Sequence, residues 1–165
     1  MSPDDVVRLL DLLDGAGVRW WVDGGWGIDA LLRYQTREHS DLDLAVDEEG
    51  LAVTVDLLRD EGYAVIRDWL PTAIAFCRET DGSEVDLHPV RSTPDGGGDQ
   101  VQLDGVTVYH YGSPVAGEIG GMSVLCCPID DQIRCHLGYE PTAKDRQDMA
   151  ALAAAFELAL PEPYA

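Results

Sequence analysis

The sequence predicts an α/β fold of the α+β kind, in which helices flank a mixed, twisted sheet. Helical and β-rich segments alternate in the first half of the chain, β-rich segments dominate the middle, and two helical segments follow Pro128. A chain of 165 residues is long enough to bury a core as one domain. We therefore expect one domain over residues 1–127 and a short helical part over residues 128–165 packed on it.

The N-terminal segment carries the signals of a helix start. Ser2 can cap free backbone N–H groups, Pro3 is tolerated in the first helical turn, and two acidic residues follow. Apolar residues recur at helical spacing until Gly15-Ala16-Gly17 ends the helix. The next expected elements are a strand at 18–22, a helix at 26–33, a strand at 41–46, a helix at 48–60 and a strand at 63–67.

Turn-forming residues divide the second half of the chain. Asp81-Gly82 and Asp104-Gly105 lie between β-rich segments, which is typical of hairpins. Residues 92–99 are rich in Gly, Pro and Asp and are expected to form a mobile loop. The expected elements are hairpins over 74–90 and 101–108, a strand at 122–125, and helices at 129–137 and 144–158.

The bulk composition narrows the class of protein. A net charge of −20 repels phosphate backbones, so no nucleic-acid partner is expected, although an acidic surface can also simply aid solubility. No apolar run is long enough to span a bilayer, and the acidic N-terminus does not resemble a signal peptide. The four cysteines lack CxxC spacing, which favours free thiols in a reducing compartment. We therefore expect a cytoplasmic protein without a membrane partner.

Two strands carry acidic residues on one face. Asp41 and Asp43 are two apart, so their side chains project together, roughly 6.6–6.8 Å apart along the strand. Asp86 shares a face with Glu84 and His88 in a second strand. If the strands are neighbours, three carboxylates meet, and their mutual repulsion favours binding of one or two Mg²⁺ ions. The alternative is an edge strand with a solvated polar face.

A diglycine turn precedes this acidic strand. Gly24 and Gly25 lie between an expected strand and an expected helix, where backbone N–H groups can bind an anion. Glycine lets the backbone approach a phosphate closely. A tight connection without a ligand is the alternative, and the sequence contains no GxxxxGK[ST] P-loop.

Together these segments resemble a known family. The sequence is similar to the small aminoglycoside and lincosamide nucleotidyltransferases, which belong to the DNA polymerase beta-like nucleotidyltransferase superfamily. Many superfamily members have Gly-Ser at the turn, whereas this chain has Gly25 in the second position. The resemblance is carried by residues 21–31 (WVDGGWGIDAL), 36–44 (TREHSDLDL), 86–90 (DLHPV), 138–140 (GYE) and 144–148 (KDRQD).

The resemblance implies a fold, an activity and a set of site residues. The domain over residues 1–127 would have the nucleotidyltransferase fold. It would move a nucleoside monophosphate, with AMP the first choice, from an NTP onto a hydroxyl of a small molecule and release pyrophosphate. Asp41 and Asp43 would bind Mg²⁺, with two ions expected, and Asp86 would be a further ligand or the general base. Gly24 and Gly25 would hold the triphosphate.

Three basic residues are further candidates for nucleotide binding. Arg37 and His39 precede the acidic strand, and Lys144 opens the last helix. The alternative for Arg37 is a solvated loop charge. For Lys144 it is an i, i+4 ion pair with Asp148, typically worth ~0.2–0.5 kcal/mol.

Glu84, His88 and Tyr139 are candidates for acceptor binding, although His88 could be a structural histidine and Tyr139 a packing residue. With Glu79 and the acids of residues 95–99, Glu84 could surround a cleft suited to a polycationic aminoglycoside, and a lincosamide would not need so many acids. A nucleotidyltransferase of the antitoxin type that modifies a protein, and a catalytically silent binding protein, are the alternative functions. The resemblance also implies a possible homodimer.

Overall fold

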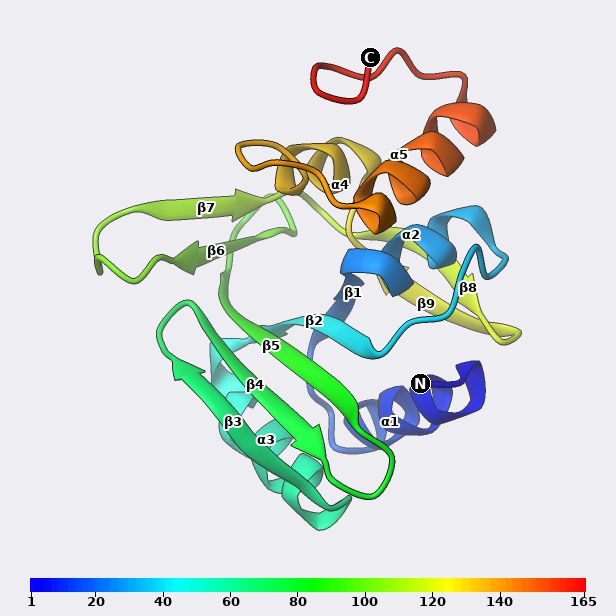
Figure 1. Ribbon diagram of the computed structural model, residues 1–165. Helices are drawn as coiled ribbons and strands as arrows, with labels where there is room; N and C mark the ends of the chain where they lie inside the picture. Colours follow the sequence, from blue (N-terminus) through cyan, green and yellow to red (C-terminus); the bar gives the residue numbers. More distant parts are fainter.

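A nine-stranded mixed sheet forms the centre of the computed structural model, which describes residues 1–165 (Figure 1). The sheet contains both parallel and antiparallel pairs, so the predicted fold class is confirmed. The strands are β1 (Trp20–Asp23), β2 (Asp41–Asp47), β3 (Tyr63–Trp69), β4 (Ala73–Arg78), β5 (Ser83–Ser92), β6 (Gly98–Val101), β7 (Val108–Tyr111), β8 (Val115–Ile119) and β9 (Met122–Cys126).

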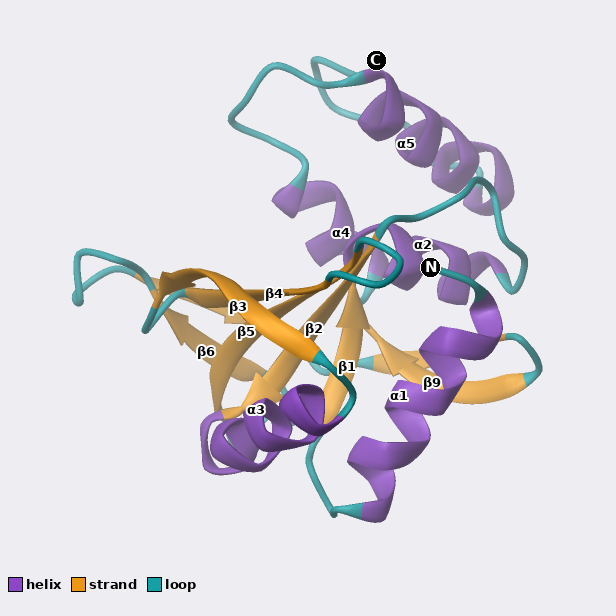
Figure 2. Cartoon of the chain, turned by 60° about the horizontal axis from the view of Figure 1, so that its bottom comes forward, coloured by secondary structure: helices purple, strands orange, loops and turns teal.

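Helices cover both faces of this sheet. They are α1 (Pro3–Gly15), α2 (Gly24–Leu32), the 3-10 turn η1 (Glu48–Gly50), α3 (Leu51–Asp60), α4 (Ile129–Cys135) and α5 (Ala143–Phe156). Figure 2 shows α1 and α3 on one side of the sheet and α2, α4 and α5 on the other. None of the helices has both the length and the apolar character needed to cross a bilayer.

The strand order places the two acidic strands next to each other. The main path of the sheet is β3-β4-β5-β2-β1-β9-β8, and the β6–β7 hairpin continues from β5. Strands β2 and β5 run parallel over their whole contact, and β1 pairs antiparallel with β2 on its other side. The sequence could name the acidic strands but not their pairing, which follows from the packing of α3 and the β3–β4 hairpin between them in the chain.

Helix α1 begins where the sequence predicted. The Ser2 hydroxyl accepts a hydrogen bond from the Asp5 backbone N–H at 3.2 Å, and the Asp5 carboxylate accepts one from the Ser2 backbone N–H at 3.1 Å. This reciprocal capping satisfies two N–H groups that the helix itself leaves free. The apolar residues of α1, Val6, Leu9, Leu10 and Leu13, are all buried.

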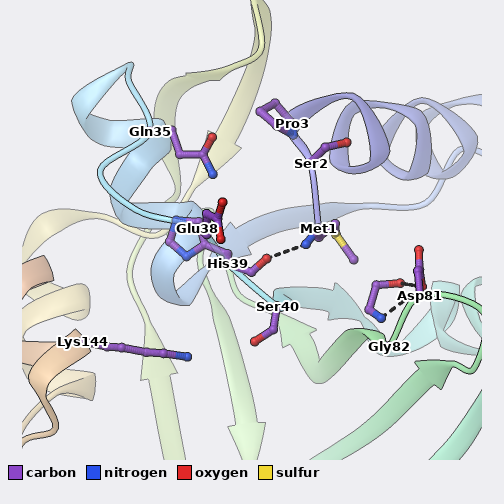
Figure 3. A pocket seen from close by; sticks show the side chains of 11 residues that line it. Met1, Ser2, Pro3, Gln35, Glu38, His39, Ser40, Asp81, Gly82 and Lys144 are labelled. Atoms are coloured by element: carbon purple, nitrogen blue, oxygen red, sulfur yellow. Dashed lines mark hydrogen bonds between the residues drawn. The ribbon is translucent and has the colours of Figure 1, made fainter.

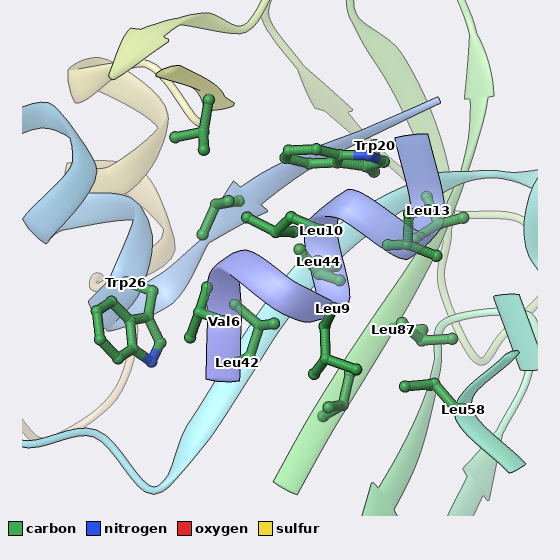
Figure 4. Close-up of a cluster of buried hydrophobic side chains, with 14 of the residues drawn as sticks. Val6, Leu9, Leu10, Leu13, Trp20, Trp26, Leu42, Leu44, Leu58 and Leu87 are labelled. Carbon is green, nitrogen blue, oxygen red and sulfur yellow. The ribbon is translucent and has the colours of Figure 1, made fainter. Parts of the chain in front are cut away.

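The main core lies between the sheet and helices α1 and α3 (Figure 4). Alternation along β2 turns Leu42 and Leu44 into this core, and Val85 and Leu87 of β5 lie in the same layer. Burying each such side chain contributes roughly 1.5–3 kcal/mol. The acidic residues between them are therefore forced onto the opposite face. The four cysteines are free thiols, of which Cys126 and Cys127 are buried.

The C-terminal helices pack on α2 rather than on the main core. Ile28 and Leu32 of α2 form a second apolar cluster with Met149 and Leu152 of α5. This cluster holds α5 above the end of the sheet at which α2 begins. The division of the chain at residue 128 into a domain and a helical part stays a prediction.

Several elements differ from those expected. Strand β8 was not predicted, because Gly117 weakens the strand pattern; a Cβ there would lie 2.7 Å from the Ala30 carbonyl oxygen in α2. The helix expected at 48–60 is divided into η1 and α3. Residues 93–97 form a turn between β5 and β6, in which Gly97 N–H donates to Asp95 Oδ1 at 3.2 Å. Its mobility stays a prediction.

Candidate active site

Three carboxylates lie in one row across the sheet. Asp43 on β2 is paired with Asp86 on the parallel strand β5, and with Asp23 on the antiparallel strand β1. Residues paired directly across neighbouring strands project from the same face, so all three side chains leave the sheet on the side away from the main core. We call Asp23, Asp43 and Asp86 the carboxylate row.

A second acidic pair follows one step along the same strands. Asp41 lies opposite Glu84, two residues before Asp43 and Asp86 respectively. All four side chains share one face, as the alternation predicted. The predicted neighbourhood of Asp41, Asp43, Asp86 and Glu84 is therefore found.

Asp86 is poorly solvated. Its Oδ1 is buried and has no hydrogen-bond partner, and its side chain is 24% exposed. Burial, and next the negative charge of Asp43, raise the pKa of Asp86, because both disfavour its ionised form. Such a carboxyl is suited to accept a proton or to gain a cation as a partner.

Asp23 is a site residue that the sequence reasoning missed. It is 6% exposed and caps α2, accepting a hydrogen bond from the Gly24 N–H at 2.8 Å through Oδ1. Burial raises its pKa, and the charge of Asp43 acts in the same direction. An aspartate directly before Gly24 at a strand-to-helix junction is itself an N-cap signal, and this could have identified it.

The diglycine turn forms the first turn of α2 rather than a loop before it. Gly24 has φ +58°, and a Cβ on it would overlap the Asp43 carboxylate. A Cβ on Gly25 would lie 2.5 Å from His39 Nδ1 and 2.7 Å from Arg37 Nη2. Both glycines are therefore required sterically, and the helix N-terminus lies directly beside Asp43.

Arg37 is engaged within the chain. Its Nε and Nη2 donate to Asp148 of α5 at 2.9 and 2.6 Å, and its Nη1 donates to the Glu38 carbonyl oxygen at 3.2 Å. The side chains of Arg37 and Asp148 are 14% and 2% exposed. This buried ion pair fastens α5 to the segment that leads into β2, so Arg37 is not a solvated loop charge. Its contact with nucleotide stays a prediction.

His39 is buried beneath the start of α2. Its Nε2 lies 2.5 Å from Asp29 Oδ2, and its ring packs on Trp26 with 4.7 Å between the centroids. Its Nδ1 is buried without a partner and faces Gly25. His39 thus supports the diglycine turn from below. A direct contact with phosphate stays a prediction.

Lys144 lies at the start of α5 and points into a pocket of about 650 Å³ (Figure 3). Glu38, His39, Ser40 and Ser83 line this pocket, which is next to the end of β2 that carries Asp41. Asp148 pairs with Arg37 and not with Lys144, so the alternative of an i, i+4 ion pair for Lys144 is not found. The start of α1, at Met1, Ser2 and Pro3, also lines this pocket. A contact of Lys144 with nucleotide stays a prediction.

Of the three residues predicted to bind the acceptor, Glu84 and His88 lie near the carboxylate row and Tyr139 does not. His88 lies in the site, with its Nε2 3.5 Å from Asp43 Oδ1. Burial disfavours its charged form, but the hydrogen bond and charge of Asp43 and the charges of Asp23 and Asp86 prevail and raise its pKa. Tyr139 follows α4, is 46% exposed and has Asp145 and Tyr164 as polar neighbours. The structure therefore does not bring Tyr139 to the carboxylate row.

The sequence reasoning also missed Arg67, whose positively charged guanidinium lies beside Asp86. Arg67 Nη2 on β3 lies 3.7 Å from Asp86 Oδ2 and 3.9 Å from Glu84 Oε2. It reaches them across Ala75 of β4, which pairs with both Arg67 and Asp86 and has too small a side chain to block the path. The guanidinium also lies 5.1 Å from the Trp69 ring centroid. Only the strand order reveals this arrangement.

The carboxylates of Asp41, Asp43 and Asp86 are suitable ligands for a hard cation such as Mg²⁺, but their oxygens do not converge on one point. No group of three or more His, Cys, Asp or Glu side chains is arranged to hold a metal ion. The expected convergence of Asp41, Asp43 and Asp86 is therefore found in the strand register but not in the side-chain positions, because like charges favour orientations that keep them apart. Carboxylate oxygens are the ligands that Mg²⁺ prefers, and the buried Asp86 Oδ1 has no hydrogen-bond partner.

Comparisons with known proteins extend over almost the whole chain. The family described as Aminoglycoside-2''-adenylyltransferase matches residues 5–152. A lincosamide resistance protein from Staphylococcus haemolyticus is 31% identical over 154 residues, which cover 92% of this chain and 94% of that protein.

Two solved structures show the same arrangement of elements. The lincosamide antibiotic adenylyltransferase LnuA with bound lincomycin has a TM-score of 0.82 and 28% identity, covering 92% of this chain and 96% of LnuA. ANT(2'')-Ia in complex with adenylyl-2''-tobramycin has a TM-score of 0.67 and 19% identity, covering 92% of this chain and 90% of ANT(2'')-Ia, and at this identity shows the fold alone. As the sequence resemblance predicted, this chain has the nucleotidyltransferase fold and belongs to the aminoglycoside-2''-adenylyltransferase family.

Proposed function

We propose that this chain is a Mg²⁺-dependent adenylyltransferase that moves AMP from ATP onto a hydroxyl of a lincosamide-type antibiotic. The observation that carries the proposal is the pairing of Asp43 with Asp86 beside the N-terminus of α2. Carboxylates that bind metal, next to backbone N–H groups that bind phosphate, are what transfer of a nucleotidyl group requires. The choice of ATP follows the adenylyltransferase relative LnuA.

In this proposal each part of the site has a separate task. Asp41 and Asp43 would hold one or two Mg²⁺ ions, which when bound neutralise phosphate charge and acidify the attacking hydroxyl. Of the two roles open to Asp86, further ligand or general base, the proposal takes the second. The first turn of α2, at Gly24 and Gly25, binds the triphosphate through backbone N–H groups. Lys144 approaches the triphosphate from α5.

The chemical step is an in-line displacement at the α-phosphorus. The acceptor oxygen forms a bond to this phosphorus, and the bond from it to the oxygen bridging to the β-phosphate breaks, so that pyrophosphate leaves. Asp86 takes the proton of the acceptor hydroxyl, because its raised pKa makes it a better base than an ordinary aspartate. Arg67, 3.7 Å from Asp86 Oδ2, lowers the pKa of this carboxyl and so opposes part of the rise that burial and Asp43 cause.

Three observations favour a lincosamide over a polycationic aminoglycoside, which the acidic composition had suggested. Asp95 and Asp99 are both engaged by His110, at 3.0 and 2.7 Å, and do not line the carboxylate row. Arg67 instead places a positive charge beside Asp86 and Glu84. This charge offsets part of the negative charge of the site and so weakens its attraction for a polycation. The lincosamide resistance protein is also 31% identical to this chain, whereas the aminoglycoside enzyme ANT(2'')-Ia is 19% identical.

The proposal is tested by incubating the protein with Mg²⁺, each of the four NTPs, and lincomycin, clindamycin, tobramycin or no acceptor. Pyrophosphate release and the mass of the acceptor are measured. We expect release with ATP and a lincosamide, together with an acceptor heavier by one AMP. Release only with tobramycin would overturn the acceptor class. No release with any acceptor would overturn the enzymatic function, and transfer onto an added protein would favour the antitoxin type.

A matched pair of variants connects activity to the site. Asp43→Asn should lower turnover by about 10²–10³-fold, which corresponds to about 3–4 kcal/mol of transition-state stabilisation. Asp47→Asn changes an aspartate at the far end of the same strand and should leave turnover within about 2-fold. Equal activity of the two variants would show that the carboxylate row does not catalyse the reaction. Homodimer formation stays a prediction, which analytical ultracentrifugation can check.

A further inference from the structure

A chain of polar contacts runs from the β6–β7 hairpin to the carboxylate row. Gln100 on β6 is 5% exposed, and its Nε2 donates to the Thr72 carbonyl oxygen at 2.8 Å. The same Nε2 lies 3.2 Å from Nδ1 of His88. His88 Nε2 in turn lies 3.5 Å from Asp43 Oδ1. A residue outside the main path of the sheet is thereby connected to a proposed metal ligand.

The Thr72 carbonyl fixes the orientation of the Gln100 amide, and the Gln102 amide is oriented to match it. A backbone carbonyl can only accept a hydrogen bond, so the nitrogen of the amide must face Thr72. The oxygen of the amide, Oε1, accepts from Gln102 Nε2 at 3.2 Å. Exchanging the two amide atoms would place two acceptors together at Thr72 and two donors together at Gln102.

This orientation determines where the His88 ring carries its proton. The amide nitrogen of Gln100 can only donate, so the His88 Nδ1 that faces it must accept and carries no proton in the neutral ring. The proton of the neutral ring is then on Nε2, the nitrogen that faces Asp43. The hydrogen bond that Nδ1 accepts from Gln100 thus determines that Nε2 presents an N–H group to Asp43.

We propose that Gln100 is a positioning residue, which holds His88 in the Nε2–H tautomer so that this N–H orients the Asp43 carboxylate. The geometry is the one by which partners of a metal-binding side chain commonly orient it. Only the consequence for metal binding and turnover rests on the proposed function. The tautomer itself is a property of the resting protein.

The tautomer can be measured by ¹⁵N NMR of the four histidines at a pH at which His88 is neutral, without nucleotide or acceptor. A spectrum of His88→Asn identifies the His88 signals. We expect the proton on Nε2, with Nδ1 in the chemical-shift range of an unprotonated nitrogen. A proton on Nδ1 in the unaltered protein would overturn the proposal, whatever reaction the protein catalyses.

Variants of Gln100 then test the cause. Gln100→Leu removes the donor, so His88 should populate both tautomers. Gln100→Glu has the same shape but offers only acceptors when ionised, so the proton should move to Nδ1. Thr72→Val is the matched control, because it removes the 3.1 Å bond from the Thr72 hydroxyl to the Val101 carbonyl oxygen without changing the contact with His88. An unchanged tautomer in both Gln100 variants would overturn the proposal.

Metal affinity and kinetics separate positioning from a general structural role. Gln100→Leu should weaken Mn²⁺ binding and lower kcat by about 10-fold or more. The KM for ATP should stay within about 2-fold, since the turn that holds the triphosphate is unchanged. Thr72→Val should change neither value. A loss of thermal stability in Gln100→Leu, with Mn²⁺ affinity, kcat and tautomer all unchanged, would mean that Gln100 only joins the hairpin to the sheet.

Discussion

Asp43 and Asp86 lie directly opposite each other on two parallel strands, so two carboxylates that are 43 positions apart in the sequence become nearest neighbours on the sheet. Neither gains stability from this pairing. Like charges at such close range raise the free energy of the folded protein unless a cation or a proton is bound between them. The arrangement is therefore evidence of a site built for a function at the expense of stability.

Replacing Asp86 should stabilise the protein and inactivate it. Its raised pKa means that the fold disfavours the ionised form, so Asp86→Asn removes an unfavourable term at neutral pH. We expect a gain of about 0.5–2 kcal/mol in the free energy of unfolding without Mg²⁺, the usual range for such substitutions. Turnover should fall about 10²–10⁴-fold if Asp86 is the base. Urea unfolding and a pyrophosphate assay measure the two effects.

Asp81 is a suitable control, because its pKa is shifted in the direction opposite to that of Asp86. A hydrogen bond from Arg78, and others from Ser83, lower the pKa of Asp81, so its ionised form stabilises the fold. Asp81→Asn should therefore lower the free energy of unfolding without changing kcat. If Asp86→Asn were destabilising like Asp81→Asn, the strained state of the carboxylate row would be refuted.

Gly24 should not tolerate even one added methyl group. A Cβ at this position would overlap the Asp43 carboxylate, and φ of +58° is costly for any other residue. Gly24→Ala should therefore displace Asp43 and reduce turnover by at least about 10²-fold. Gly15→Ala is the matched control, because nothing lies within 4 Å of the added Cβ. Similar activity in the two variants would contradict the described contact.

We expect the ion pair between Arg37 and Asp148 to contribute mainly to the stability of the protein, and only little to the binding of ATP. Removing one partner leaves a buried charge alone, so Arg37→Met or Asp148→Leu should cost roughly 3–5 kcal/mol of stability. The double variant should recover much of this loss, and its KM for ATP should stay within about 2-fold. A KM that rises 10-fold or more in the double variant would instead support the nucleotide contact predicted for Arg37.

His110 should make the β6–β7 hairpin sensitive to pH. The hydrogen bond to Asp99, and then the bond and charge of Asp95, raise the pKa of His110 above its usual 6.5. The protonated form is thus favoured by folding, and its contribution to stability is complete below about pH 6.5 and is lost as the pH rises through the higher pKa of the folded protein. NMR titration should show this pKa above 6.5 and lowered in Asp99→Asn. A value at or below 6.5 in the unaltered protein would be incompatible with this account.

The sequence predicts the elements better than their arrangement. Capping at Ser2, the strand predicted at 41–46 and the turn at Asp81-Gly82 are local signals, and all three are confirmed, although the alternation of burial holds only from Asp41 to Leu44. Strand β8 was missed because glycine has a low strand propensity. Gly117 is required there by its close contact with α2, which is distant in the sequence. Local sequence patterns reflect interactions between residues close in the chain, and they do not show contacts between distant segments.

The candidate site follows the same division. Spacing placed Asp41 and Asp43 on one face and identified Asp86 on a second acidic strand, and the family resemblance implied the roles of all three. Arg67 and the partner of Arg37 could not be found, because they depend on which strand or helix lies alongside. Gln100 is a polar residue on a short strand, and only its burial against His88 distinguishes it.

The most direct test of the central claim is a crystal structure of the protein with Mg²⁺ and an ATP analogue that cannot be cleaved between its α- and β-phosphates. We expect Mg²⁺ within about 2.0–2.1 Å of oxygens of Asp41 and Asp43. We also expect the triphosphate at the first turn of α2 and the α-phosphorus facing Asp86. Metal bound elsewhere, or a triphosphate away from Gly24 and Gly25, would contradict the account.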